Sequence, residues 1–229
     1  MSAATIDLAR IAGGFGDPVH HAQATFRALL DAFARPGLVR ALPDEVARSL
    51  GRPARFSPAL AAGVLTLLDA ETRLWLSPAL SEGDAPTWCR FHSGARAAGA
   101  IGTAAFVAMR AEEVEAETLA ALNPGTDEAP HRAATLIVEV NALAGAALVV
   151  DRMALAGFEA ARDPGTQCLA LTGPGIEHTH RLFVAGLPRD FWRARIAAQA
   201  DYPCGVDLLL TCGTRFAAIP RSTRIALGD

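Results

Sequence analysis

The stretch Thr135–Val140, TLIVEV, is rich in β-branched residues and almost continuously apolar. Such a run is typical of a strand that is buried on both faces, as at the centre of a parallel sheet. It lies inside a longer apolar run, 133–150, which contains Glu139 and Asn141 and is interrupted by Gly145. Because a charge and an amide are costly in lipid, we interpret this run as buried strand and expect no membrane span.

Alternating helix and strand signals lie on both sides of this stretch. Asp17 before Pro18, and Ser57 before Pro58, combine an N-cap side chain with a proline at the first helical position, so both predict a helix start. The other patterns follow the 3.6-residue period of helices or the two-residue period of strands. Predicted helices cover residues 18–33, 58–68, 84–91, 112–122 and 188–199, and predicted strands cover 38–42, 74–76, 104–109, 135–140, 167–171, 206–211 and 216–219. This order predicts an α/β fold with a mixed β-sheet and flanking helices.

The chain is expected to fold as one domain. It has no fixed-period repeat, low-complexity linker or sharp shift in composition, so residues 18–229 are predicted to form a single α/β domain. Residues 1–17 have no clear periodicity and are predicted to be a loosely ordered N-terminal segment. This segment also lacks the basic and apolar regions of a signal peptide, and we therefore expect a cytoplasmic protein.

The composition indicates which kinds of molecule this protein could bind. Hydrophobic residues make up 51% and charged residues 20% of the 229 residues, which is typical of a folded globular protein. The formal net charge of -3 provides no basic field for nucleic acid, so we expect no nucleic-acid partner. Because surplus apolar surface is often covered by another subunit, the composition favours oligomerisation.

All 21 residues counted as Lys+Arg are arginine, so the chain contains no lysine. An enzyme that uses pyridoxal phosphate holds this cofactor as a Schiff base with lysine, and a P-loop contacts the β- and γ-phosphates through lysine. Both kinds of site are therefore excluded. The four cysteines are widely spaced and form no C-x-x-C pair, which favours reduced thiols over a disulfide framework or a zinc site.

Two short segments contain candidate ligand-binding residues. Arg90 and His92 lie in the segment CRFHSG and could bind an anionic group, because a guanidinium forms bidentate contacts with phosphate-like oxygens. They could instead pair with a carboxylate and cap a helix C-terminus. Gly173 and Gly175, in LTGPGI, could present backbone N–H groups to a phosphate or form a tight turn.

Arg221 is a further candidate for ligand binding, in a third segment. It follows the predicted C-terminal hairpin and could project toward a ligand or another subunit. Alternatively, it could form an ion pair with Asp207 across this hairpin, because a buried carboxylate requires a partner.

Two further arrangements contain residue types that could form a chemical site. Cys89 and His92 are three residues apart in a predicted helix, as a nucleophile and its base would be, but no third orienting group is evident. His178 and His180 would point the same way in an extended segment, yet no third ligand has matched spacing, so we predict no metal site. These patterns assign no catalytic residue.

Seven segments between Pro18 and Ile225 form a combined pattern. They are FRALLDAFARPG (26–37), LLDAET (67–72), RFHSGA (90–95), ATLIV (134–138), LTGPGI (171–176), GVDLLLTCG (205–213) and AIPRST (218–223). Taken together, they resemble the PhnH family, the H subunits of carbon-phosphorus lyase systems. The most specific part of this resemblance is RFHSGA followed later in the chain by the last two segments, GVDLLLTCG and AIPRST.

The resemblance implies a homodimer with a cytoplasmic role in phosphonate breakdown. It implies assembly with subunits G, I and J into a lyase core complex. With G, I and the ATPase-like subunit L, such a protein supports transfer of a phosphonate to the ribose C1 of ATP, which releases adenine and forms ribose 1-phosphonate 5-triphosphate. Subunit J, an iron-sulfur radical protein, then cleaves the carbon-phosphorus bond.

The resemblance also implies a fold similar to that of pyridoxal-phosphate-dependent transferases. Because the chain has no lysine, it cannot form the aldimine, so we predict no pyridoxal phosphate cofactor and an accessory, non-catalytic subunit. One alternative is a nucleotide- or phosphonate-binding module that acts outside a stable complex through Arg90, Arg221 and the Gly173–Gly175 turn. Another is an independent hydrolase that uses Cys89 and His92.

Overall fold

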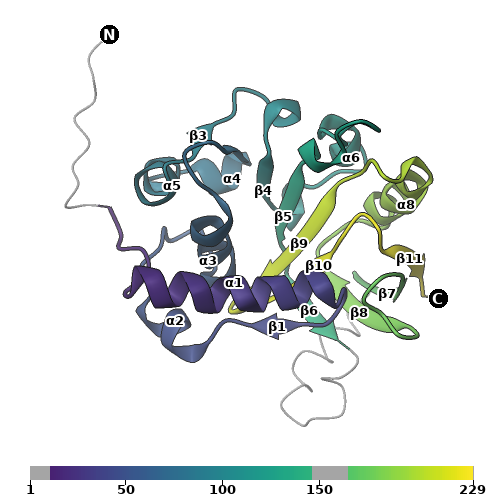
Figure 1. Cartoon of the computed structure of the whole chain (residues 1–229), viewed down its shortest axis with the longest axis horizontal. Helices are drawn as coiled ribbons and strands as arrows, with labels where there is room; N and C mark the ends of the chain where they lie inside the picture. The colour runs from purple at the N-terminus through teal and green to yellow at the C-terminus, as the bar shows by residue number, and fades with distance from the viewer. Residues whose placement is uncertain (1–10, 146–164, 229) are drawn as a thin grey trace.

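A seven-stranded sheet forms the centre of the computed structural model, which describes residues 11–145 and 165–228 (Figure 1). Its strand order is β1-β10-β9-β5-β4-β2-β3. The strands are β1 (Arg40–Ala41), β2 (Arg73–Leu76), β3 (Arg96–Ala97), β4 (Phe106–Arg110), β5 (Thr135–Glu139), β9 (Asp207–Cys212) and β10 (Arg215–Ile219). Strands β3, β2, β4, β5 and β9 pair in parallel, whereas β10 pairs antiparallel with β9 and β1. The TLIVEV stretch is the central strand β5, so the predicted mixed sheet is confirmed.

Alternate residues of the central strands enter two different hydrophobic cores. Ile137 of β5 and Leu209 of β9 pack in one core with helices α1 (Pro18–Ala34), α3 (Pro58–Leu67) and α5 (Ala85–Ser93). Leu136, Val138 and Leu208 pack in the other core. Both faces of the sheet are therefore covered, which explains the continuous apolar run in β5.

The second face of the sheet is covered by a four-stranded antiparallel sheet and helix α8 (Arg189–Ala197). The order of this sheet is β11-β7-β8-β6, and its strands are β6 (Ala142–Gly145), β7 (Thr166–Thr172), β8 (His180–Ala185) and β11 (Arg224–Leu227). Figure 1 shows β7, β8, α8 and β11 at the C-terminal side of the molecule. Sequence patterns predicted β7, and the buried-strand interpretation of residues 133–150 includes β6, but β8 and β11 were not predicted. Residues 146–150 of that run lie outside the described part of the chain.

The two predicted N-cap residues begin α1 and α3, the two longest helices in the described part of the chain. The Asp17 carboxylate accepts a hydrogen bond from the His20 N–H (3.1 Å), and the Ser57 hydroxyl accepts one from the Leu60 N–H (3.2 Å). Helix α3 is buried on several sides, from Ala59 to Val64, as its apolar sequence predicts. None of the helices among the described residues is long and apolar enough to cross a membrane.

The predicted acidic helix over 112–122 is wrong. The segment contains a short 3-10 turn, Ala111–Glu113, and a four-residue helix, α6 (Thr118–Ala121). Glu113 binds the Ser77 hydroxyl and accepts a hydrogen bond from the Ala79 N–H (2.9 Å) in α4 (Pro78–Ser81). The Thr118 hydroxyl accepts a hydrogen bond from the Glu115 N–H (2.9 Å), which starts a new turn. These side-chain contacts replace a continuous helix.

Part of the predicted loose N-terminal segment makes specific contacts. The carbonyl of Gly13 accepts a hydrogen bond from the Trp88 indole (3.0 Å), and that of Gly14 accepts one from the Gly51 N–H (3.0 Å). Gly51 directly follows α2 (Asp44–Ser49), a helix that the sequence patterns missed. Residues 11–17 are therefore anchored on α5 and α2, whereas residues 1–10 lie outside the described part of the chain.

The turn after β7 packs against the C-terminal end of α1. Gly175 has a left-handed φ of 80°, and a Cβ atom there would lie 2.0 Å from the carbonyl oxygen of Ala34. Gly173 has a φ of 132°, and its Cβ would lie 3.1 Å from the carbonyl oxygen of Ser222. The turn thus requires glycine at both positions to fit between two other segments.

We expect Gly175→Ala to lower the free energy of unfolding by at least about 2 kcal/mol, through a strained φ and a backbone clash. Urea denaturation followed by circular dichroism measures this change. The control is Gly99→Ala, because a Cβ there meets nothing within 4 Å and its φ is not left-handed. Equal stability of the two variants would contradict the proposed packing of the turn.

Candidate functional site

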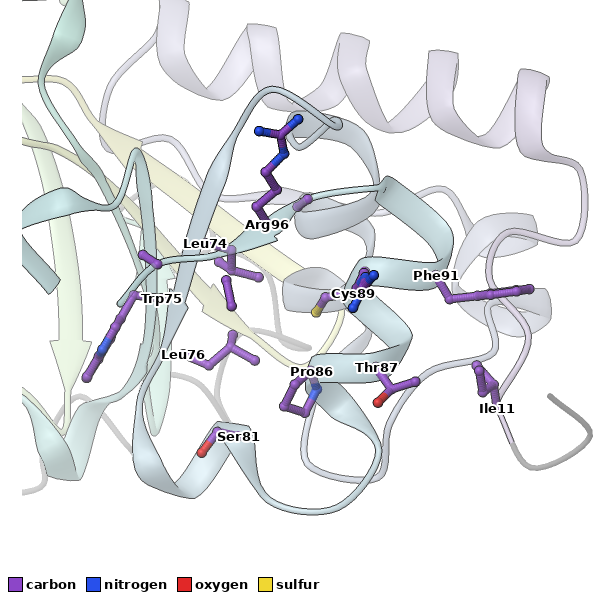
Figure 2. A pocket seen from close by; sticks show the side chains of 14 residues that line it. Ile11, Leu74, Trp75, Leu76, Ser81, Pro86, Thr87, Cys89, Phe91 and Arg96 are labelled. Atoms are coloured by element: carbon purple, nitrogen blue, oxygen red, sulfur yellow. The ribbon is translucent and has the colours of Figure 1, made fainter. Parts of the chain in front are cut away.

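A pocket lies between α5 and the β2–β3 edge of the central sheet. Its volume is about 550 Å³, which is within the range of small-molecule sites. Figure 2 shows Leu74, Leu76 and Cys89 around its apolar interior, with Arg96 on β3. The lining residues are Ile11, Leu74, Trp75, Leu76, Ser81, Pro86, Thr87, Cys89, Arg90, Phe91, Ala95, Arg96, Ala97 and Ala98. This pocket is the best candidate for a ligand site.

The pocket lies beyond the end of the edge strand β3, which is shorter than its neighbour β2. Strand β3 has two residues, and the N–H of Ala98, just beyond it, donates to the carbonyl of Leu74 (2.9 Å). Among the described residues, no later backbone hydrogen bond joins the segment after β3 to β2. The remainder of β2, at Trp75 and Leu76, therefore borders the pocket directly.

Two exposed arginines line this pocket and a third, Arg73, lies beside them, all without carboxylate partners among the described residues. Arg90 and Arg96 line it, and Arg73 pairs with Arg96 in the β2–β3 register, so their side chains lie on the same face. None of the three forms an ion pair within the described residues, unlike Arg40 and Arg110, which bind Asp31 and Glu112. Unpaired like charges side by side are unfavourable, so the edge is suited to an anion.

His92 is not grouped with Arg73, Arg90 and Arg96. Its Nε2–H donates to the carbonyl of Ala12 (2.9 Å), and its ring contacts those of Trp88 and Phe91. The C-cap of α5 is Gly94, with a left-handed φ of 76°. His92 therefore lies in the last turn of α5 and anchors the N-terminal segment there, while Gly94 is the C-cap residue.

Cys89 is unsuited to act as a nucleophile. Its side chain is buried at the base of the pocket, and burial raises the pKa of the Cys89 thiol to about 12. The thiol therefore stays protonated at neutral pH, whereas the thiolate is the reactive form. This finding opposes the hydrolase alternative with Cys89 and His92.

The other sequence candidates lie away from the first pocket. Arg221 lines a separate cavity of about 60 Å³ beside α8. Its guanidinium binds the carbonyl of Pro130, and its backbone N–H donates to the carboxylate of Asp207 (2.7 Å). The predicted side-chain ion pair between Arg221 and Asp207 is thus wrong, because the carboxylate is satisfied by the backbone instead. Gly173 lies next to Ser222, near Arg221, so Arg90 does not share a site with these residues.

The smaller cavity contains a buried cation that sequence reasoning missed. Arg195 of α8 is 3% exposed, and its guanidinium donates to the carbonyl of Pro220 (3.0 Å). Burial lowers the pKa of Arg195 to about 10, although the charge of Asp207 acts in the opposite direction. Helical periodicity gave no signal for this residue, because α8 carries arginines on its exposed face as well.

Acidic side chains gather at the carboxyl ends of β4 and β5. Glu139 accepts a hydrogen bond from the Ser57 N–H (3.1 Å), and burial raises the pKa of Glu139. Burial opposes ionisation of Glu112, but a hydrogen bond from its own backbone N–H and one from Arg110 (2.7 Å) lower the pKa of Glu112. The Glu139 contact joins the start of α3 to the sheet and the Arg110 contact is local to the end of β4, so we assign both a structural role.

The His178 and His180 pair is split by the start of β8. A ring N–H of His180, at Nδ1, donates to the carbonyl of Pro36 (2.7 Å), whereas exposed His178 lies 3.7 Å from Glu177. Within residues 11–145 and 165–228, no group of three His, Cys, Asp or Glu side chains could hold a metal ion.

We expect Cys89 to resist alkylation by iodoacetamide in the folded protein at pH 8. With a pKa near 12, about one thiol in ten thousand is ionised at that pH, and burial restricts access further. Peptide mass spectrometry should show at least about 100-fold slower labelling of Cys89 than in urea-unfolded chain, where the pKa is about 8.5. Labelling should accelerate about tenfold with each pH unit below the pKa, and should accelerate sharply when the protein unfolds. Rapid labelling of folded protein at pH 8 would restore Cys89 as a candidate nucleophile.

Comparisons with known proteins give the relationships of this chain. The family model described as "Bacterial phosphonate metabolism protein (PhnH)" matches residues 13–226. The chain is 36% identical over 214 residues to "Alpha-D-ribose 1-methylphosphonate 5-triphosphate synthase subunit PhnH" of Rhizobium meliloti (strain 1021), and the match covers 93% of this chain and 94% of that protein. It is 46% identical over 59 residues to "Putative C-P lyase subunit protein HtxG" of Stutzerimonas stutzeri, covering 26% of this chain and 30% of that protein. The family-model match includes nearly all of the described fold, together with the pocket at the β2–β3 edge, and the chain therefore belongs to the PhnH family of bacterial phosphonate metabolism proteins.

Proposed function

We propose that this protein is a subunit of a carbon-phosphorus lyase core complex. In this role it is required, with partner subunits, to form ribose 1-phosphonate 5-triphosphate from ATP and a phosphonate. The observation that carries the proposal is the 36% identity to the Rhizobium meliloti synthase subunit across nearly the full length of both chains. Because the match is almost end to end, it includes both cores of the fold rather than one shared motif.

The proposed role is accessory and non-catalytic, in the cytoplasm, as a homodimer that assembles with subunits G, I and J. Subunit L joins for the transfer step. The transferase and lyase activities belong to the complex as a whole. Support for the accessory role comes from Cys89, whose buried thiol has a pKa of about 12 and thus is no nucleophile at neutral pH.

We further propose that the fold is similar to that of pyridoxal-phosphate-dependent transferases, but without this cofactor. The support is a seven-stranded, largely parallel sheet with helices α1, α3 and α5 on one face. The sequence supplies no lysine for an aldimine, so any chemistry at this scaffold must be of another kind.

Genetic complementation tests the proposed function. In a bacterium that lacks its own PhnH-family gene, we expect this chain to restore growth with methylphosphonate as the sole phosphorus source. Growth on inorganic phosphate is the control and should not depend on the chain. Mass photometry with purified subunits G, I and J of the same organism should show this protein in one defined, larger assembly. A folded chain that neither restores growth nor assembles would refute the proposal.

A second candidate function is binding of a nucleotide or phosphonate in the pocket at the β2–β3 edge. The specific observation in its favour is the set of unpaired arginines, Arg73, Arg90 and Arg96, beside an apolar pocket of about 550 Å³. The lining residues that the structure describes include no carboxylate. Guanidinium groups would bind phosphate-like oxygens, and the apolar walls would contact a flat or alkyl group.

Titration calorimetry with ATP, methylphosphonate and pyridoxal phosphate tests this pocket. Loss of two charged hydrogen bonds in the double variant Arg90→Gln/Arg96→Gln should weaken binding of the responding ligand by about 100-fold or more. Arg193→Gln is the matched control, because Arg193 is exposed on α8 and already pairs with Asp190. Three flat titrations, or equal affinity in both variants, would exclude the pocket as an anion site.

A further inference from the structure

Strand β2 has an open segment on the side of β3. The carbonyl of Leu74 faces β3, because it accepts a hydrogen bond from the Ala98 N–H (2.9 Å). Backbone groups two residues apart in a strand point the same way, so the N–H and C=O of Leu76 face this side as well. The next N–H, that of Ser77, donates to Ala108 of β4 on the opposite side (2.9 Å), which fits this alternation. Among the described residues, no hydrogen bond joins Leu76 to the segment after β3.

The pocket borders this open edge on both faces of the sheet. Leu74 and Leu76 pack in the core that contains α5, whereas Trp75 packs against the core on the other face. All three line the pocket, and Figure 2 shows Trp75 pointing away from Leu74 and Leu76. Successive side chains of a strand also alternate between two faces, so a pocket of this form fits an added strand.

The charge at this edge indicates what the added strand carries. Arg73 and Arg96 lie opposite each other in the β2–β3 pairing, and Arg90 lies in the last turn of α5. None of the three forms an ion pair within the described residues, and the described lining of the pocket includes no Asp or Glu. A carboxylate side chain on the added strand would form charge-assisted hydrogen bonds with these guanidinium groups.

Two further features favour a peptide over a small anion. Covering Leu76 removes its N–H and C=O from water, so the occupant must supply an acceptor and a donor. A peptide backbone supplies both, whereas a phosphonate group has no N–H. Phe91, which is 55% exposed, also lines the pocket next to Arg90, and exposed aromatic and arginine side chains are enriched at protein interfaces.

We propose that the β2–β3 edge binds an extended segment of a partner subunit. This segment pairs with Leu76 in line with β3 and places an acidic side chain beside Arg90 and Arg96. The inference rests on the assembly with partner subunits in the proposed function. It adds the position of the contact on this chain and the chemistry of the segment that binds there.

Hydrogen exchange tests the strand pairing. The full chain is measured alone and in the complex with subunits G, I and J, by mass spectrometry with fragmentation that resolves single amides. The Leu76 amide should exchange at least about 10-fold more slowly in the complex, because its N–H gains a hydrogen-bond acceptor. The Ser77 amide is the internal control, since it already donates to Ala108 and its exchange should change far less.

Charge reversal tests the acidic character of the partner segment. Arg90→Glu/Arg96→Glu should weaken assembly with subunits G, I and J by at least about 30-fold in mass photometry, because attraction becomes repulsion. Arg181→Glu/Arg224→Glu is the matched control and should assemble like the wild-type chain. These two arginines are also exposed but lie on β8 and β11 of the other sheet. Far-UV circular dichroism confirms that both variants are folded.

The other outcomes separate this inference from the proposed function. A complex that forms without slower exchange at Leu76 would overturn the inference and leave the proposed function in place. A folded chain that does not assemble with subunits G, I and J would refute the proposed function, and the inference with it. Slower exchange at Leu76 on addition of ATP or methylphosphonate alone would assign the edge to a small ligand instead. Equal assembly of the two charge-reversed variants would exclude an acidic partner segment.

Discussion

Burial of β5 and β9 on both faces is the constraint on which the rest of the structure depends. Alternate residues of these strands, such as Leu136 and Ile137, point into two separate cores. Neither face of the sheet is exposed to water at the centre, so each needs a covering layer. Helices α1, α3 and α5 supply one layer, and the four-stranded sheet with α8 supplies the other.

Potential binding features are consequently found where the layers end. The edge strand β3 of the central sheet has only two residues. The pocket at this edge has apolar walls from β2 and α5. Arg73, Arg90 and Arg96 lie at this edge without ion pairs among the described residues, whereas Arg40 and Arg110 are paired with carboxylates. A subunit of a larger assembly needs surfaces of this kind.

Much of the fold was predictable because local signals agree with tertiary demands. The Asp17 and Ser57 caps, the apolar helix α3 and the C-terminal hairpin β9–β10 all lie where sequence patterns indicated. Prediction failed where long-range contacts override local periodicity. The acidic segment at 112–122 is held by Ser77 and Ala79 from another part of the chain, and strands β8 and β11 are defined by their pairing partners.

By itself, the sequence determined the α/β class, the central buried strand and the absence of any lysine chemistry, because these follow from residue type and spacing along the chain. It also contained the combined pattern of the PhnH family. Only the tertiary structure decided that Arg90 and Arg221 lie at separate cavities, that Cys89 is a buried, protonated thiol, and that Arg195 is a buried cation. Burial and proximity between distant segments set pKa values and form pockets, and neither quantity is encoded in the local spacing of residues.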